Sequence, residues 1–202
     1  VRSRLNMFSY GEYITPESVV SPQISSTIET VRPTFNIDPI SCADSYEIWL
    51  SNSEDSDVEN PIWISEELQS NIHPYPLDAT GLAPNGNYKW KFRINPDGDP
   101  SPWSEVFDFS IKGYSLDEPA SGEVLSTVNP KFYFSGPADV AGYELRISND
   151  EDPSVESGNI YTRNISTSPF EFPQDSPEGL LPGHTYFWKL IFLDGNDNIV
   201  GE

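Results

Sequence analysis

The sequence predicts an all-β protein made of two tandem β-sandwich domains. The first observation is an internal repeat, because motifs in the first half of the 202 residues recur 97 or 98 positions later. The second is that apolar and polar residues alternate within each repeat, which is typical of strands with one buried face. The third is that Pro, Gly, Asn and Asp cluster between these short segments, as they do in turns. Together these features favour two antiparallel sheets packed face to face in each repeat.

The repeat defines the domain boundaries that we expect. Its clearest members are the pairs 30–35 (TVRPTF) with 127–132 (TVNPKF), 46–52 (YEIWLSN) with 143–149 (YELRISN), and 82–92 (LAPNGNYKWKF) with 180–190 (LLPGHTYFWKL). Each pair reads as one strand or as one turn followed by a strand. We therefore expect an N-terminal strand or linker over 1–19, a first domain over 20–112 and a second domain over 113–202.

The two ends of the chain form a further pattern. The closing strand of the first repeat is expected around Phe107 and Phe109, and an offset of 98 from Trp103, which precedes it, reaches Gly201. The sequence therefore predicts that the second domain lacks its last strand within this chain.

Near the N-terminus, Phe8 and Tyr10 repeat the aromatic-x-aromatic spacing of that closing strand. Two interpretations follow. In the first, the chain is a segment of a longer tandem array. In the second, the Phe8–Tyr10 strand of one chain completes the second domain of its neighbour, which builds a head-to-tail fibre.

Several segments resemble the fibronectin type III-like repeats of bacterial surface and secreted proteins. They are 32–37 (RPTFNI), 46–51 (YEIWLS), 82–92 and 101–104 (SPWS), and both repeats have a Tyr, Tyr88 or Tyr186, where that family has its tyrosine corner. The resemblance implies an immunoglobulin-like sandwich used as a spacer, an adhesin segment, an enzyme appendage or a filament subunit. We therefore expect a non-catalytic extracellular structural or interaction protein; the alternative is a carbohydrate- or protein-binding accessory module of a secreted enzyme or adhesin.

Charge and motifs limit the classes of partner and activity. With 32 acidic and 11 basic residues the formal net charge is −21, which disfavours nucleic acid and anionic membranes. No apolar run is long enough to span a bilayer, and no motif of a nucleotide-binding, hydrolase or metalloprotease site occurs. We expect no enzyme activity. The expected partners are protein, either further copies or neighbouring repeats, and in the alternative polysaccharide.

The candidate ligand-binding residues surround the strand pair 46–50 and 88–94. Trp49 and Trp63 would supply aromatic faces, and Lys89, Lys91 and Arg93 would supply positive charge. The same residue types also form cross-strand pairs and cation–π contacts that only stabilise a sheet. Both interpretations stay open at this point.

The candidate metal site is a turn near the C-terminus. Its oxygen-bearing side chains belong to Asp194, Asn196, Asp197 and Asn198. Calcium is bound by six to eight such oxygens in flexible geometry. The same residues are also good turn formers, so the sequence is compatible with a calcium site or with a plain hairpin turn.

Overall fold

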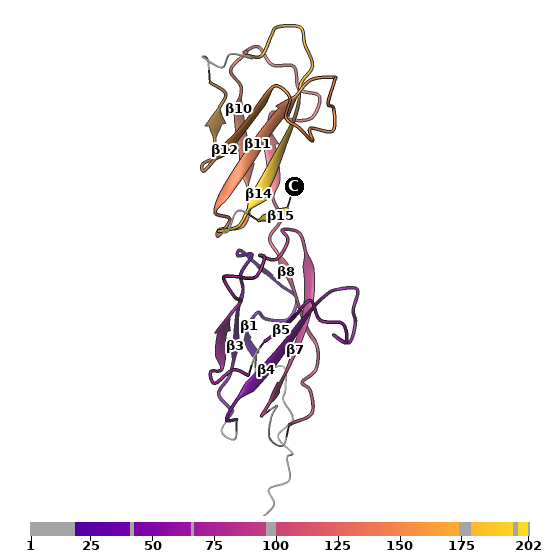
Figure 1. The fold of residues 1–202 in the computed structure, drawn as a ribbon, viewed down its shortest axis with the longest axis vertical. Coiled ribbons are helices and arrows are strands. Elements are labelled where there is room, and N and C mark those ends of the chain that lie inside the picture. The colour runs from indigo at the N-terminus through magenta and orange to yellow at the C-terminus, as the bar shows by residue number, and fades with distance from the viewer. Residues whose placement is uncertain are drawn as a thin grey trace, which may run out of the picture. The chain divides into compact units, whose positions relative to one another are not determined.

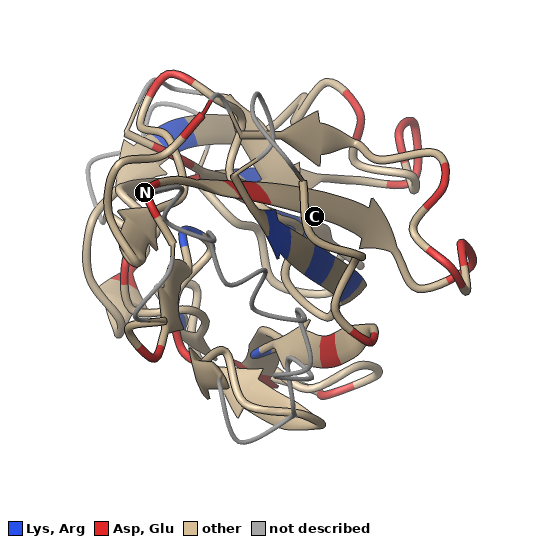
Figure 2. Ribbon diagram, turned by 90° about the horizontal axis from the view of Figure 1, so that it is seen from below, with Lys and Arg blue, Asp and Glu red and all other residues tan. Residues whose placement is uncertain are grey.

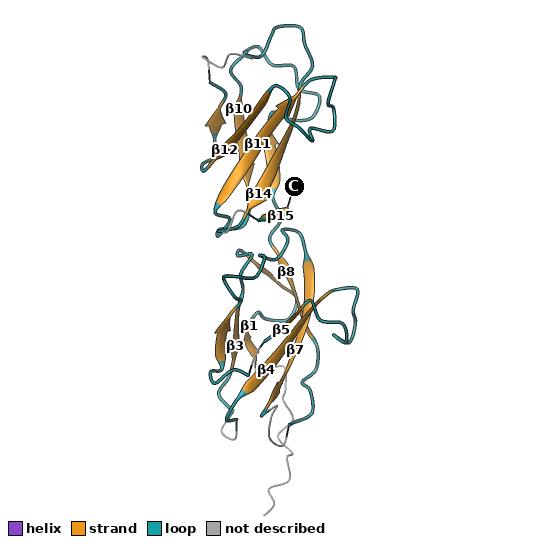
Figure 3. Cartoon of the chain, viewed as in Figure 1, coloured by secondary structure: helices purple, strands orange, loops and turns teal. Residues whose placement is uncertain are grey.

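The computed structural model describes residues 19–40, 43–65, 67–95, 100–173, 179–195 and 198–201. These residues form fifteen strands and no helix (Figures 1 and 3). The all-β fold class is therefore confirmed. No helix that could cross a membrane occurs in this part of the chain.

The described chain divides into two compact units. The first holds residues 19–26, Thr34–Pro74 and Asn87–Ser110, and the second holds Thr27–Pro33, Tyr75–Gly86 and the described residues from Ile111 onwards. The domain boundaries expected from the repeat stay a prediction.

The first unit is built from two sheets. The smaller has the order β1-β3-β6, with β1 Val19–Ser21, β3 Thr34–Ile37 and β6 Ile72–Pro74. The larger has the order β2-β8-β7-β4-β5, with β2 Ser26–Ile28, β8 Phe107–Ile111, β7 Asn87–Ile94, β4 Tyr46–Asn52 and β5 Trp63–Ile64. The end residues Thr27, Ile28 and Ile111 of β2 and β8 are grouped with the second unit. Strands β4, β7 and β8 pair antiparallel over most of their length, so residues at alternate positions face the smaller sheet.

Aromatic side chains fill the space between these two sheets. Phe35 of β3 contacts the ring of Trp90 on β7 at a centroid distance of 4.9 Å and that of Phe109 on β8 at 6.5 Å. Phe35 and Trp90 have no exposed surface. The burial of these large rings stabilises the sandwich, and it explains why the apolar residues recur at every second position.

The second unit repeats this arrangement. Its smaller sheet has the order β13-β10-β9, with β13 Phe170–Glu171, β10 Lys131–Ser135 and β9 Ser115–Glu118. Its larger sheet has the order β12-β11-β14-β15, with β12 Tyr161–Ile165, β11 Gly142–Ser148, β14 Phe187–Leu193 and β15 Ile199–Gly201. Phe132 of β10 meets Trp188 of β14 at 5.0 Å, which matches the contact between Phe35 and Trp90 in the first unit.

The expectation of an absent last strand needs a correction. Strand β15 pairs with Phe192 and Leu193 at the end of β14. In the first unit the same place is taken by residues 101–104, where Ser101 N–H donates to Ile94 O and Ser104 N–H donates to Phe92 O before β8 begins. The second unit therefore contains the beginning of its last strand. The sequence locates this strand by its aromatic residues, whereas the pairing with β14 already starts at the hairpin that precedes them.

Candidate functional site

The outward face of the first unit's larger sheet carries a cluster of two tryptophans and three charged residues. We call it the outer-face cluster; it consists of Glu47, Trp49, Lys91, Arg93 and Trp103. The antiparallel register of β4 and β7 places Glu47 opposite Arg93 and Trp49 opposite Lys91. Trp103 reaches the cluster from the segment before β8, and its ring centroid lies 4.7 Å from that of Trp49.

The two cations of the outer-face cluster lie over its indole rings. Lys91 Nζ is 5.2 Å from the ring centroid of Trp49 and 5.0 Å from that of Trp103. Arg93 Cζ is 4.7 Å from the centroid of Trp103. These distances are those of cation–π contacts, in which the ring quadrupole attracts the positive charge.

Hydrogen bonds complete the cluster. Glu47 accepts a bond of 2.8 Å from Trp49 Nε1 through one oxygen and forms an ion pair of 2.5 Å with Arg93 Nε through the other. Lys91 Nζ donates to the carbonyl oxygen of Asp57 at 2.7 Å, and only 8% of Lys91 is exposed. The charged groups of this face are thus used to hold neighbouring strands and a loop together.

The structure does not bring Trp63 together with Trp49. Trp63 lies opposite Leu50 in the pairing of β4 with β5, whereas Trp49 lies opposite Ile64, so the two indoles are on opposite faces of the sheet. Trp63 stacks on Phe35 at 5.8 Å and on His73 at 5.8 Å. Burial in this stack lowers the pKa of His73.

Lys89 and Trp103 complete the comparison with the expected site. Lys89 lies on the same strand as Lys91, two residues along, and therefore on the same face of the sheet. Sequence reasoning missed Trp103, because it lies more than fifty residues from Trp49 in an irregular segment. The sequence feature that could have pointed to Trp103 is its position in Ser-Pro-Trp-Ser, immediately before the closing strand.

The second unit has ion pairs where the first has the outer-face cluster. Arg146 takes the place of Trp49, and its Nε lies 2.5 Å from Glu144 Oε1. Lys189, opposite Arg146 in the register of β11 and β14, lies 3.5 Å from Glu156 Oε1. The shared property of the two units is that the charged side chains of this face form ion pairs, and it is not the aromatic surface.

One aspartate in each unit organises the acidic loop after β4 or β11. Asp55 accepts bonds from the hydroxyl of Ser51 at 2.9 Å and from the backbone N–H of Asn60 at 2.7 Å. Asp152 accepts bonds from the backbone N–H of Ser157 at 2.9 Å and from the hydroxyl of Ser148 at 3.2 Å. The backbone N–H of Asn60 holds the pKa of Asp55 below its usual value, and that of Ser157 does the same, more strongly, for Asp152.

The predicted calcium site falls partly outside the described residues. Asn196 and Asp197 are among those not described. Asp194 is buried and accepts bonds from Asn198 N–H at 3.0 Å and from Arg32 Nη2 at 2.9 Å, all within the second unit. No group of three or more His, Cys, Asp or Glu residues that could hold a metal occurs in the described part of the chain. The calcium hypothesis stays a prediction, and the cation that contacts Asp194 in this structure is a guanidinium.

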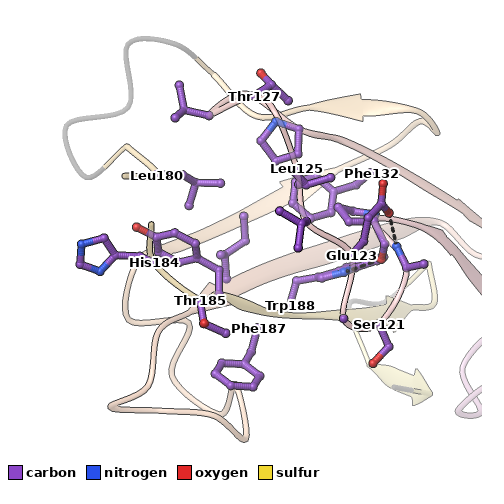
Figure 4. Close-up of a pocket in the computed structure, with 18 of the residues that line it drawn as sticks. Ser121, Glu123, Leu125, Thr127, Phe132, Leu180, His184, Thr185, Phe187 and Trp188 are labelled. Atoms are coloured by element: carbon purple, nitrogen blue, oxygen red, sulfur yellow. Dashed lines mark hydrogen bonds between the residues drawn. The ribbon is translucent and has the colours of Figure 1, made fainter. Parts of the chain in front are cut away.

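A groove of about 1070 Å³ opens beside β14 in the second unit (Figure 4). The strands contribute Phe132 and Trp188, and the neighbouring loops contribute Leu125, Val128 and Leu180. Leu125 and Val128 are 38% and 40% exposed, although both are apolar. No motif in the sequence points to this groove, because its lining residues come from separate strands and loops.

Comparisons with known proteins identify no family for the chain. No protein-family model and no curated protein matches the sequence. Three similar solved structures are the chicken CNTN1 FN1–FN3 domains (15% identity, 94% of this chain, 62% of that chain, TM-score 0.35), the Clostridium thermocellum CbhA fibronectin(III)-like modules (14%, 90%, 87%, 0.32), and the alpha-L-rhamnosidase from Dictyoglumus thermophilum (16%, 62%, 16%, 0.35). The chain therefore spans less than two thirds of the CNTN1 and rhamnosidase structures that it matches. The fold described above rests on the strands and cores themselves.

Proposed function

We propose that the chain is a non-catalytic structural or interaction segment built of fibronectin type III-like repeats, and that it works outside the cell as a spacer, an adhesin segment or a filament subunit. The observation that carries this proposal is that the charged side chains of the outer-face cluster are engaged in contacts within the first unit. Glu47, Lys91 and Arg93 are engaged with one another, with indole rings and with a loop carbonyl. Side chains used in this way stabilise a module and leave little for the recognition of a small ligand.

The distribution of charge supports the same proposal. Figure 2 shows most Asp and Glu segments in loops, and three basic residues, Lys89, Lys91 and Arg93, occupy alternate positions of β7. An acidic coat of this kind keeps exposed strand edges from pairing indiscriminately. Protein partners and the extracellular location are parts of the proposal.

The proposal is tested with the purified chain and a panel of soluble polysaccharides. We expect no change in tryptophan fluorescence and no release of reducing sugar. Antibody labelling of intact cells of the source organism is expected to reach the protein. Saturable fluorescence change, turnover of a polysaccharide, or label confined to permeabilised cells would each contradict the proposal.

The alternative function is carbohydrate or protein binding by an accessory module. The observation that favours it is that Trp49 and Trp103 are half-exposed on the outward face, with ring centroids 4.7 Å apart. This alternative predicts a fluorescence response that disappears in Trp49→Ala. The response would survive in Trp63→Ala, because Trp63 lies on the opposite face of the sheet.

A further inference from the structure

We propose that His73 is a pH switch of the first unit: its neutral imidazole joins the outermost strands of the two sheets, and protonation releases that contact. These strands are β5, at one end of the larger sheet, and β6, at one end of the smaller sheet. The inference concerns a conformational response to acid. It goes beyond the proposed function and does not depend on it.

Three aromatic rings connect β5 and β6 across the sandwich. We call them the three-ring cluster; they are Phe35, Trp63 and His73. Phe35 and His73 lie directly opposite each other in the pairing of β3 with β6, so both rings project from the same face of the smaller sheet. Trp63 of the larger sheet packs on both, with centroid distances of 5.8 Å and interplanar angles of 15° to Phe35 and 10° to His73.

The strands that the cluster joins are short. Strand β5 has two residues and β6 has three, and one of the three is Pro74, which has no N–H to donate. Short strands form few ladder hydrogen bonds, so side-chain packing between them carries more of the stability of this edge. A change in the three-ring cluster should therefore act on β5 and β6 first.

No charge compensates a proton on His73. The elements packed against the imidazole are β3, which places 34–36 (TFN) along it, and β5, which consists of Trp63 and Ile64. Its neighbours on β6 are Ile72 and Pro74. None of these side chains is charged or titratable, so an imidazolium in this place would lack a counter-ion among the residues of these three strands.

The second unit has a ring that cannot be protonated in the equivalent place. Phe170 lies opposite Phe132 in the pairing of β10 with β13, just as His73 lies opposite Phe35. Tyr161 takes the place of Trp63, and its ring centroid lies 6.3 Å from that of Phe170. The fold therefore accommodates a phenyl ring at this position, and acid sensitivity from this position belongs to the first unit.

The direction of the response follows from burial. His73 is half-buried against two aromatic rings, which disfavours the charged form and lowers its pKa. The unfolded chain binds the proton at about pH 6.5, and the folded chain binds it only at lower pH. The stabilisation by His73 is thus fully present above about pH 6.5 and is lost as the pH falls from there to the pKa of the folded state. A dominant cation–π attraction between the imidazolium and Trp63 would give the opposite sign.

The test follows thermal unfolding of the full chain by tryptophan fluorescence between about pH 8 and pH 5. Four of the five tryptophans belong to the first unit, namely Trp49, Trp63, Trp90 and Trp103. We expect the melting temperature of the unmodified chain to fall relative to that of His73→Phe by at least about 2 °C over this range. The matched control is His184→Gln, which removes the exposed histidine of the second unit and should not reproduce this dependence.

Hydrogen exchange locates the released contact. After correction for the intrinsic effect of pH on exchange, the amides of β5 and β6 should lose at least about threefold of their protection at pH 5 relative to pH 7.5. Their equivalents β12 and β13 in the second unit should keep theirs, and so should β5 and β6 in His73→Phe.

Three results would overturn the inference: equal pH dependence in the unmodified chain and His73→Phe, a relative rise of the melting temperature on acidification, or equal losses of protection in the two units. If His73→Phe does not fold, the comparison of the two units within the unmodified chain still decides. None of these results bears on polysaccharide binding or on location, so the proposed function is tested separately.

Discussion

Lys91 contributes to stability through three contacts at once, although a lysine on an outward strand face is usually solvated. Its ammonium group donates to Asp57 O and lies over the rings of Trp49 and Trp103. We expect Lys91→Ala to lower the free energy of unfolding by about 1–3 kcal/mol, since a charged hydrogen bond and two cation–π contacts are lost. Denaturant unfolding measures this change. Lys89→Ala, on the same face, should stay within about 0.5 kcal/mol, and equal losses in the two variants would contradict the assignment.

Asp152 should make the second unit sensitive to acid. The hydrogen bonds from Ser157 hold its pKa below the usual value of about 3.9 for an aspartate in an unfolded chain. The stabilisation is therefore present above about pH 4 and is lost as the pH falls through the lower pKa of the folded state.

We accordingly expect Asp152→Asn to lower the melting temperature at pH 7 and the difference from the unmodified chain to shrink below about pH 4. Calorimetry over pH 2–8 measures both effects. Asp150→Asn, at an exposed position two residues earlier, is the matched control. A difference that stays constant with pH would show that the loop depends on the shape of Asp152 and not on its charge.

At the scale of the elements, the equivalent phenylalanines of the two repeats, Phe35 and Phe132, have different neighbours. Phe35 on β3 is enclosed by Trp63, Trp90 and Phe109, whereas Phe132 on β10 packs on Trp188 and borders the groove. Truncation of an enclosed phenylalanine leaves a cavity, and truncation beside a groove enlarges a space that water already reaches.

Phe35→Ala should therefore cost about 3–5 kcal/mol of unfolding free energy, and Phe132→Ala should cost less. The two values come from chemical denaturation followed by near-ultraviolet circular dichroism, which reports the tryptophans of both units. An equal or larger cost for Phe132→Ala would mean that its surroundings are as closed as those of Phe35.

At the scale of the whole molecule, the net charge of −21 acts against the folded chain. Like charges repel one another most when the chain is compact, and salt screens this repulsion over a Debye length of about 10 Å at 0.1 M. We expect the melting temperature to rise between about 10 mM and 0.5 M NaCl. A fall would show that attractive pairs such as Glu47 with Arg93 outweigh the repulsion.

The sequence predicted the all-β class from local periodicity, and it grouped Trp49 with Lys89, Lys91 and Arg93 on the expectation that their two strands are neighbours. Alternation places Trp49 on one face of its strand, and the neighbouring strand in the sheet supplies the lysine. The sequence could not place Trp103, since an irregular segment has no period. It also could not separate Trp63 from Trp49, because the register of β4 with β5 decides the face on which Trp63 lies.

The sequence by itself determined the class of fold, the repeated order of its strands and the acidity of the surface, all of which depend on composition and on periods of two and 97 residues. Only the tertiary structure decided that Lys91 and Arg93 lie over indole rings. It also decided that Asp55 and Asp152 each hold a loop through hydrogen bonds. The groove that Tyr186 and Trp188 border is likewise visible only in the folded chain. The physical reason is that these contacts join residues distant along the chain. Register and loop path, which no local pattern encodes, bring them together.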